Sequence, residues 1–164
     1  MKLLHLAVND LTDKISELLN GNAPRETALE NVLRETLRHF RSESGTIHIL
    51  DVDKQLLHLA AQVGLPPQLL DVVKTIPVGK GIAGQVVAQN KPVSICNLQT
   101  DGSGVAKPGA KQTGLGGTIC VQIRAGDQVT GTFGIGTVRP YQYTAEEAQE
   151  LEEIGRRIGE FLKG

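Results

Sequence analysis

Residues 76–95 read IPVGKGIAGQVVAQNKPVSI, and this stretch decides the fold that we expect for the chain. It opens with a Pro-Val-Gly turn, where three glycines allow sharp turning and close backbone packing. The apolar residues that follow recur at helical spacing and predict a short helix. Asn90 and Pro92 end that helix, because Asn tolerates a left-handed cap and Pro cannot continue a helix. A short helix across the mouth of a sheet commonly walls a small-molecule pocket.

Length and charge narrow the class of protein. The 164 residues suffice for one domain with a substantial core and are too few for two, so we expect a single domain over residues 1–164. The net charge is -1 and no segment concentrates Lys and Arg, so nucleic acid is not an expected partner. No apolar run approaches the roughly 18 residues that span a bilayer. We therefore expect a cytoplasmic protein without a membrane partner, in which Cys96 and Cys120 are reduced, partly buried thiols.

The two ends of the chain carry heptad-like apolar stripes. The first stripe consists of Leu4, Val8, Leu11, Ile15 and Leu18, and the second of Leu151, Ile154, Ile158 and Phe161. Thr144 and Glu147 have capping-box spacing ahead of the second stripe. A further amphipathic helix is predicted after Pro24. We expect residues 1–20 and 144–163 to be helices through which the chain forms a homodimer.

Alternating apolar residues predict two β-hairpins. Residues 46–51 and 56–63 flank the first turn, and residues 118–124 and 128–137 flank the second. One face of the first hairpin is wholly apolar and is expected to pack against the helices; its residues are Ile47, Ile49, Leu57, Leu59, Ala61 and Val63. On the other, mixed face we expect His48 and His58 to be cross-strand neighbours. The order of helices and strands predicts an α+β fold with a largely antiparallel sheet.

Residues 97–117 form an expected long loop with six glycines and one proline. Loops of this length inside a compact domain are usually functional or disordered. Two interpretations stay open for this segment: a lid beside a pocket, and a merely mobile loop.

The stretch at residues 76–95, the later GGTICVQIRAGDQVTGTFGI and the capped helix after Tyr143 together resemble the GAF domain family. The resemblance covers essentially the whole chain. It implies a six-stranded antiparallel sheet with the terminal helices on one face, and short helices plus the long loop over a ligand cavity on the other. GAF domains are small-molecule sensor modules that commonly dimerise through terminal helices. The resemblance names no ligand or cofactor, because members of the family bind several unrelated classes.

The resemblance also allows this chain to be compared, residue by residue, with the enzymes of the family. Free methionine-(R)-sulfoxide reductases carry cysteines before the IPVG turn, inside the GVCG version of the GIAG turn and in the long loop. This chain has Val73, Ala83 and a cysteine-free loop at those places. It has no Cys-His neighbours for a bilin and no NKFDE signature of cyclic-nucleotide phosphodiesterase domains. We therefore expect no catalytic set and no enzyme.

The expected ligand-binding residues lie on the mixed sheet face and on the short helix. They are His48, His58, Gln62, Ile82, Gln85, Val86, Cys120 and Gln122. The two histidines lack a third ligand for a metal site, and the glycine turn fits no phosphate-loop spacing. Lys107 and Lys111 could close over an anionic ligand, although solvated loop lysines are the simpler interpretation.

The leading hypothesis is a sensor or regulatory domain that binds an unidentified small molecule and passes the signal to a separate partner protein. The first alternative is a redox enzyme related to the sulfoxide reductases, with its cysteines moved to Cys96 and Cys120. The second alternative is a degenerate domain that serves only in protein assembly, for which a pocket filled by its own side chains would be the telling observation.

Overall fold

The computed structural model describes residues 2–106 and 108–163, and the side chains of residues 10–106 and 109–163. The first half of the chain contains α1 (Lys2–Asn20), α2 (Arg25–His39), β1 (Ser44–Asp51), β2 (Leu56–Val63), the 3-10 helix η1 (Pro67–Leu69), α3 (Leu70–Val73), β3 (Thr75–Pro77) and α4 (Gly81–Gln89). The second half contains β4 (Val93–Ile95), α5 (Pro108–Lys111), β5 (Thr118–Ala125), β6 (Gln128–Gly136) and α6 (Ala145–Lys163).

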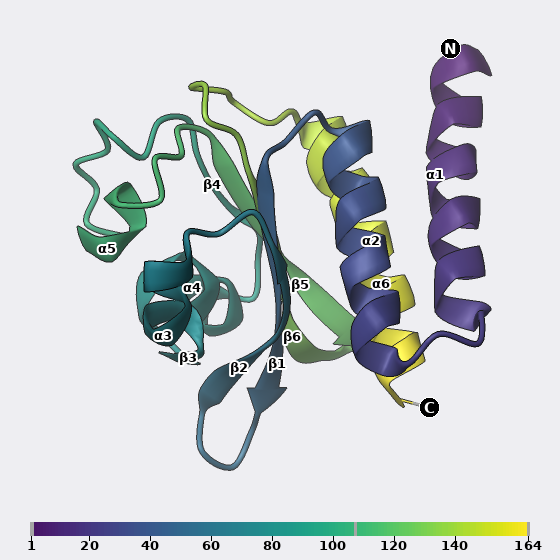
Figure 1. Cartoon of the computed structure of the whole chain (residues 1–164), viewed down its shortest axis with the longest axis horizontal. Helices are drawn as coiled ribbons and strands as arrows, with labels where there is room; N and C mark the ends of the chain where they lie inside the picture. The colour runs from purple at the N-terminus through teal and green to yellow at the C-terminus, as the bar shows by residue number, and fades with distance from the viewer. Residues whose placement is uncertain (1, 107, 164) are drawn as a thin grey trace.

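The strands form one antiparallel six-stranded sheet in the order β3-β2-β1-β6-β5-β4. The helices α1, α2 and α6 lie on one side of this sheet, and α3, α4 and α5 lie on the other (Figure 1). This arrangement confirms the α+β expectation. The residue pattern alone missed β3, because its three residues are too short to show an alternation.

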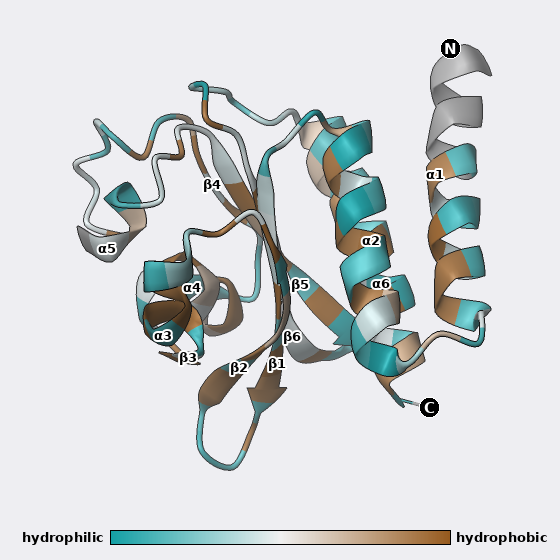
Figure 2. Ribbon diagram, in the orientation of Figure 1, coloured by the Kyte–Doolittle hydropathy of each residue, from teal (hydrophilic) through white to brown (hydrophobic). Residues whose placement is uncertain are grey.

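The main hydrophobic core lies between the sheet and the layer of α1, α2 and α6. Figure 2 shows apolar residues along the central strands and polar ones on the outward sides of the helices. The helix α6 approaches β5 most closely at Gly155 and Gly159. A Cβ at Gly155 would collide with the carbonyl oxygen of Gln122, and one at Gly159 with that of Arg124. The backbones of helix and strand are therefore in direct contact at these glycines.

Both predicted apolar stripes pack inside this same core. Leu11 and Ile15 of α1 are buried there, as are Leu151, Ile154 and Ile158 of α6, with Leu18 and Phe161 packed at its margin. Leu4 and Val8 lie outside the described side chains. The described stripe residues thus bind the helices of one chain to each other and to the sheet, and homodimerisation stays a prediction.

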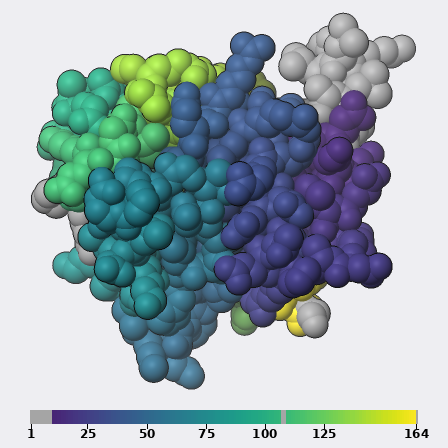
Figure 3. All heavy atoms as spheres, viewed as in Figure 1, coloured from purple at the N-terminus to yellow at the C-terminus, as the bar shows by residue number. Residues whose placement is uncertain are grey.

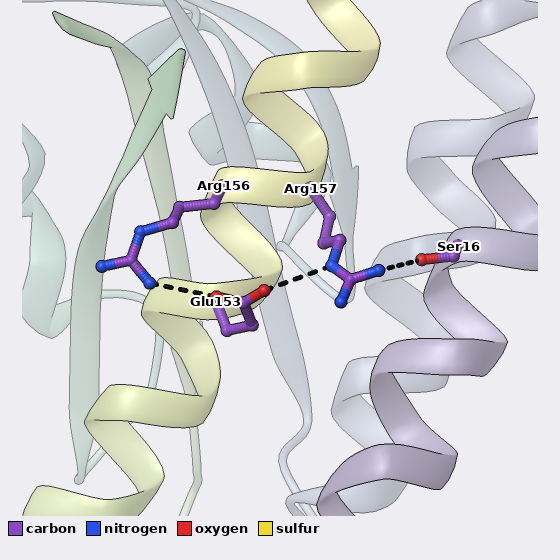
Figure 4. Close-up of polar contacts among 4 residues, drawn as sticks. All are labelled: Ser16, Glu153, Arg156 and Arg157. Carbon is purple, nitrogen blue, oxygen red and sulfur yellow. Dashed lines mark hydrogen bonds and ion pairs between the residues drawn. The ribbon is translucent and has the colours of Figure 1, made fainter. Parts of the chain in front are cut away.

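Polar contacts also join the two terminal helices. The guanidinium of Arg157 donates a 2.7 Å hydrogen bond to the hydroxyl of Ser16 on α1. Glu153, one turn earlier on α6, holds both Arg156, at 3.0 Å, and Arg157, at 3.2 Å (Figure 4). Arg157 is thereby positioned to reach across from α6 to α1.

The predicted helix signals are confirmed at two helix ends. Thr144 and Glu147 form a reciprocal capping box at the start of α6, with N–H to side-chain distances of 2.9 and 3.1 Å. Asn90 ends α4 in the left-handed conformation, with φ of 54°.

A β-bulge in β2 changes the register that strict alternation predicts. Ile47 of β1 pairs with Ala61 of β2. The next residue of β1, His48, pairs with Leu59 instead of Ala60, so Ala60 is one extra residue in β2. Ala60 and Ala61 accordingly both pack against the helix-side core.

The register at the β1–β2 turn shows that the expected pairing of the two histidines is wrong, because Asp51 pairs with Leu56 and the hairpin therefore centres between Asp53 and Lys54. Residues directly opposite each other share a face of the sheet, and His58 pairs with Ile49. His58 therefore lies on the opposite face from His48, where it is 3.9 Å from the carboxylate of Asp51. For the same reason Leu57 and Leu59, expected against the helices, lie on the face of His48.

Across the described part of the chain, none of the helices is both long and apolar enough to cross a membrane.

Candidate functional site

The register of three strands builds the floor of a candidate site on the sheet face opposite α2 and α6. Its residues form three rows across β1, β6 and β5: first Ser44, Gly136 and Thr118, then Thr46, Gly134 and Cys120, and then His48, Thr132 and Gln122. The residues between them, such as Ile47 and Phe133, point into the helix-side core. The floor therefore consists of small and polar residues, with glycine at two positions of its middle strand.

The first two rows and His48 line a cavity of about 190 Å³. Its walls come from three segments: Val72 and Val73 of α3 with Ile76 of β3, Ile82 and Ala83 on α4, and Ala106, Gly109, Ala110, Thr113 and Leu115 from the long loop. Most of these walls are aliphatic, so the site combines an apolar enclosure with a polar floor.

The start of α4 is fixed to the turn that precedes it. Gly84 lies against the backbone at Pro77, where an added Cβ would come within 2.5 Å of the carbonyl oxygen. The side-chain amide of Gln85 donates to the carbonyl oxygen of Gly79 at 2.7 Å. These contacts orient the helix so that Ile82 and Ala83 line the cavity.

The segment 97–117 folds over one side of the cavity. Leu98 and Leu115 form a small second core with Ile95, against which Ile82 of α4 also packs. The amide of Gln99 ties the segment together by donating to the carbonyl oxygens of Lys111, at 3.1 Å, and Leu115, at 2.9 Å. The α3 segment and the segment around α5 meet on this side of the molecule (Figure 3).

Three of the eight expected ligand-binding residues line the cavity, namely His48, Ile82 and Cys120. The other five do not. Val86 is fully buried where α4 packs on β5 and β6, and Gln122 is buried in the third row, outside the cavity.

The remaining three residues lie away from the cavity for separate reasons. The register set by the β1–β2 turn places His58 on the other face, where it is exposed. The side-chain oxygen of Gln62 accepts a hydrogen bond from the backbone N–H of Leu65 at 3.2 Å and so holds the turn after β2. Gln85 holds the turn before α4, as described above.

Sequence reasoning missed several small residues that shape the site. The sequence pattern assigned Gly134, Gly136 and Thr118 only to strands and Ala110 only to a loop, although all four line the cavity. A signal existed for the glycines, since glycine inside a strand often marks close approach of a ligand or another segment.

His48 is the most buried ionisable group at the cavity, with 2 % of its surface exposed. Its Nε2 lies 2.8 Å from the carbonyl oxygen of Val73. Because a carbonyl only accepts, Nε2 carries the hydrogen and Nδ1 of the neutral ring is an acceptor. Burial lowers the pKa of His48 below its usual 6.5, against the hydrogen bond to Val73, which raises it. Nδ1 has no hydrogen-bond partner among the described residues.

The two thiols differ in exposure and in reactivity. Burial raises the pKa of the Cys120 thiol to about 12, which keeps it protonated and poorly nucleophilic at neutral pH. Cys96, expected to be partly buried on a strand, is instead exposed just after β4, because that strand ends at Ile95. Cys96 does not line the cavity.

Within the described residues, no group of three or more His, Cys, Asp and Glu side chains is placed to hold a metal ion.

Comparison with known proteins identifies relatives of this fold. A family model described as GAF domain matches residues 22–163. The chain is 27% identical over 142 residues to nitrogen fixation protein AnfA of Azotobacter vinelandii, a match that covers 85% of this chain and 26% of that protein. The chain therefore spans about a quarter of the length of this relative.

Two solved structures illustrate the range of this fold. The GAF domain of A. aeolicus nlh2, in an inactive state, has a TM-score of 0.76 and 24% identity, and the match covers 98% of both chains. Free methionine-R-sulfoxide reductase of Neisseria meningitidis, in complex with its substrate, has a TM-score of 0.78 and 16% identity, with 95% of this chain and 88% of that chain covered. At these identities the likeness establishes a common fold and leaves the chemistry open.

The neutral, buried state of His48 predicts a pH dependence of stability. The unfolded chain protonates this ring near pH 6.5, whereas the folded chain does so only at lower pH. The free energy of unfolding should therefore be greatest above pH 6.5 and fall as the pH drops towards the folded pKa, by at most about 1.4 kcal/mol per pH unit. Chemical denaturation between pH 7.5 and 5.5 measures this loss.

Two variants isolate the contribution of His48. His48→Gln should flatten the pH slope, while His58→Gln, at the half-exposed histidine, should keep it. Glu150, whose pKa burial raises, contributes the same pH dependence to the wild type and to both variants. An unchanged slope in His48→Gln would contradict the assignment.

Proposed function

The chain belongs to the GAF domain family, and we propose that it is a regulatory domain that binds a small molecule in the cavity between the sheet and α4. The observation that carries this proposal is the cavity of about 190 Å³ above a floor of small and polar residues. A domain kept only for assembly would gain nothing from leaving this space empty, because an unfilled apolar cavity lowers stability. The open cavity therefore favours ligand binding over the assembly-only alternative.

The cavity also offers an orienting group for a ligand. Small-molecule sites commonly combine apolar walls with a few polar groups that fix orientation. His48 supplies such a group here, since it borders the cavity and Nδ1 lacks a partner in the described structure. Cys120 and Thr118 add further polar atoms to the same floor.

Protein purified from its own host should retain the natural ligand, which native mass spectrometry would detect as added mass. Ala83→Leu places extra bulk at the cavity wall and should abolish that mass. Ala88→Leu adds the same bulk on the exposed side of the same helix and should keep it. Loss of the added mass in both variants, or its absence from the wild type together with no effect of host extract on thermal stability, would contradict a ligand-binding role.

The redox alternative has less support from the site. Cys120 is a protonated, buried thiol, and Cys96 does not line the cavity. The three reductase positions hold no cysteine, with Val73 and Ala83 at two of them. We therefore propose a non-enzymatic role.

An activity assay tests this point directly. Free methionine-R-sulfoxide with a thiol reductant should show no turnover above the uncatalysed rate, in the wild type and in Cys96→Ser and Cys120→Ser alike. Turnover by the wild type that either serine substitution removes would instead assign a redox activity to that cysteine.

Homodimerisation through the terminal helices is a further part of the proposed function. The helix α1 lies outermost in the helix layer (Figure 1), and the outward residues of its described part are polar. These residues are Asp10, Asp13, Lys14, Glu17 and Asn20. The charges of both signs on this surface would give the pairing of two copies its specificity and a fast encounter.

Sedimentation velocity at tens of micromolar should show a dimer. The double variant Lys14→Glu, Glu17→Lys should shift it towards the monomer, while Lys54→Glu in the β1–β2 turn serves as a control for a change of surface charge. A wild-type monomer throughout this concentration range would exclude the dimer.

A further inference from the structure

We propose that the cavity takes a compact, uncharged and mainly apolar molecule with one hydrogen-bond donor, of the class of phenols and indoles. The inference rests on the proposed function, because it names the ligand class for the same cavity. Three properties of the lining carry it: charge, size and the positions of unpartnered polar atoms.

The described lining of the cavity contains no Asp, Glu, Lys or Arg. An ion enclosed without a partner of opposite charge is strongly disfavoured, so a carboxylate, phosphate or ammonium group would lack compensation there. His48 is neutral in this environment, because burial lowers its pKa. Lys111 is exposed on α5, and Lys107 lies outside the described residues, so the experiment below includes a variant of Lys107.

The volume of the cavity suits a small molecule. An engineered apolar cavity of about 150 Å³ in another protein stays dry and binds benzene, whereas drug-sized ligands occupy about 300 to 1,000 Å³. The present cavity, at about 190 Å³, is close to the first case. It suits a ligand on the order of ten non-hydrogen atoms, which is one aromatic ring or a fused pair.

The polar requirement comes from two buried atoms at the floor. Nδ1 of His48 and Oγ1 of Thr118 have no hydrogen-bond partner among the described residues, and both residues line the cavity. Because Nδ1 can only accept, a ligand group that comes within reach of it must be an N–H or O–H to satisfy it. The hydroxyl of Thr118 can donate or accept, so it tolerates the same ligand group.

The shape of the floor favours a flat ring. The nearest neighbours of an added Cβ at Gly134 would be atoms of Cys120 and Ile119, at 3.5 Å or more, so no side chain presses on the middle of the floor. A planar molecule can lie against this strip of backbone while aliphatic side chains of α4 and the long loop cover its other face.

Four ring compounds of similar size separate charge from hydrogen bonding: toluene, phenol, benzoate and benzylamine, which is protonated at neutral pH. Titration of each into the full chain at pH 7.5, followed by heteronuclear NMR and thermal shift, gives their affinities. Phenol should bind about tenfold more tightly than toluene. Benzoate and benzylamine should bind at least about 100-fold more weakly than phenol. Ala83→Leu should abolish phenol binding, and Ala88→Leu should preserve it.

Two substitutions test whether these polar atoms bind the ligand. The measured quantity is the preference for phenol over toluene, which a change in packing alone would leave unaltered. Thr118→Val keeps the shape of the side chain and removes the hydroxyl, and His48→Phe removes the acceptor. The preference for phenol over toluene should fall by severalfold in at least one of them, while toluene binding persists. An unchanged preference in both variants would overturn the role of these atoms.

The remaining outcomes separate this inference from the proposed function. Tight binding of benzoate that Lys107→Ala removes would overturn the uncharged class, although the cavity would still be a ligand site. Failure of all four probes would also overturn the inference. If host-purified protein then still retains a molecule, the proposed function stands, whereas the absence of any retained molecule, together with no effect of host extract on thermal stability, would remove both.

Discussion

The cavity side of the sheet depends on the absence of side chains at two positions of β6. This strand is hydrogen-bonded between β1 and β5, so Gly134 and Gly136 lie along the middle of the floor. Their roles differ. A Cβ at Gly136 would come within 2.7 Å of the side chain of Leu115, so this glycine makes room for the long loop. Gly134 has no such neighbour and leaves the space that becomes the cavity.

Most of the architecture could be predicted from the sequence because its signals are local. The hairpin turns, the capping box at Thr144 and the left-handed cap at Asn90 depend on a few neighbouring residues, and each was found where it was expected. The errors arose where a turn was assumed to centre on one residue and where the alternation of residues in one part of a strand was assumed to continue along the whole strand. The first hairpin centres between Asp53 and Lys54 and not on Asp53, and Ala60 adds a bulge farther along β2 that the sequence does not signal, so the faces of Leu57, His58 and Leu59 were assigned wrongly.

The candidate site was less predictable than the fold, because a site depends on what each side chain meets. His48 and Cys120 were correctly placed at the cavity, since strand alternation in β1 and β5 decides their direction. Gln62 and Gln85 were expected there as polar residues, yet each is engaged by a nearby backbone group. Amides that can bond locally are poor indicators of a pocket unless their backbone surroundings are known.

The two faces of the sheet are under different constraints, and this difference bears on how one fold can serve several ligands. On the helix face, α6 rests directly on the carbonyl groups of β5 at Gly155 and Gly159, so even one added methyl group would displace the helix. On the other face, side chains such as Thr46 and Cys120 border open space and can change without disturbing that contact. The helix face therefore fixes the fold, while the cavity face tolerates more change in its side chains. It follows that a structural likeness at low identity says little about the ligand, and that the side chains of the floor are the part of the molecule from which the ligand class should be inferred.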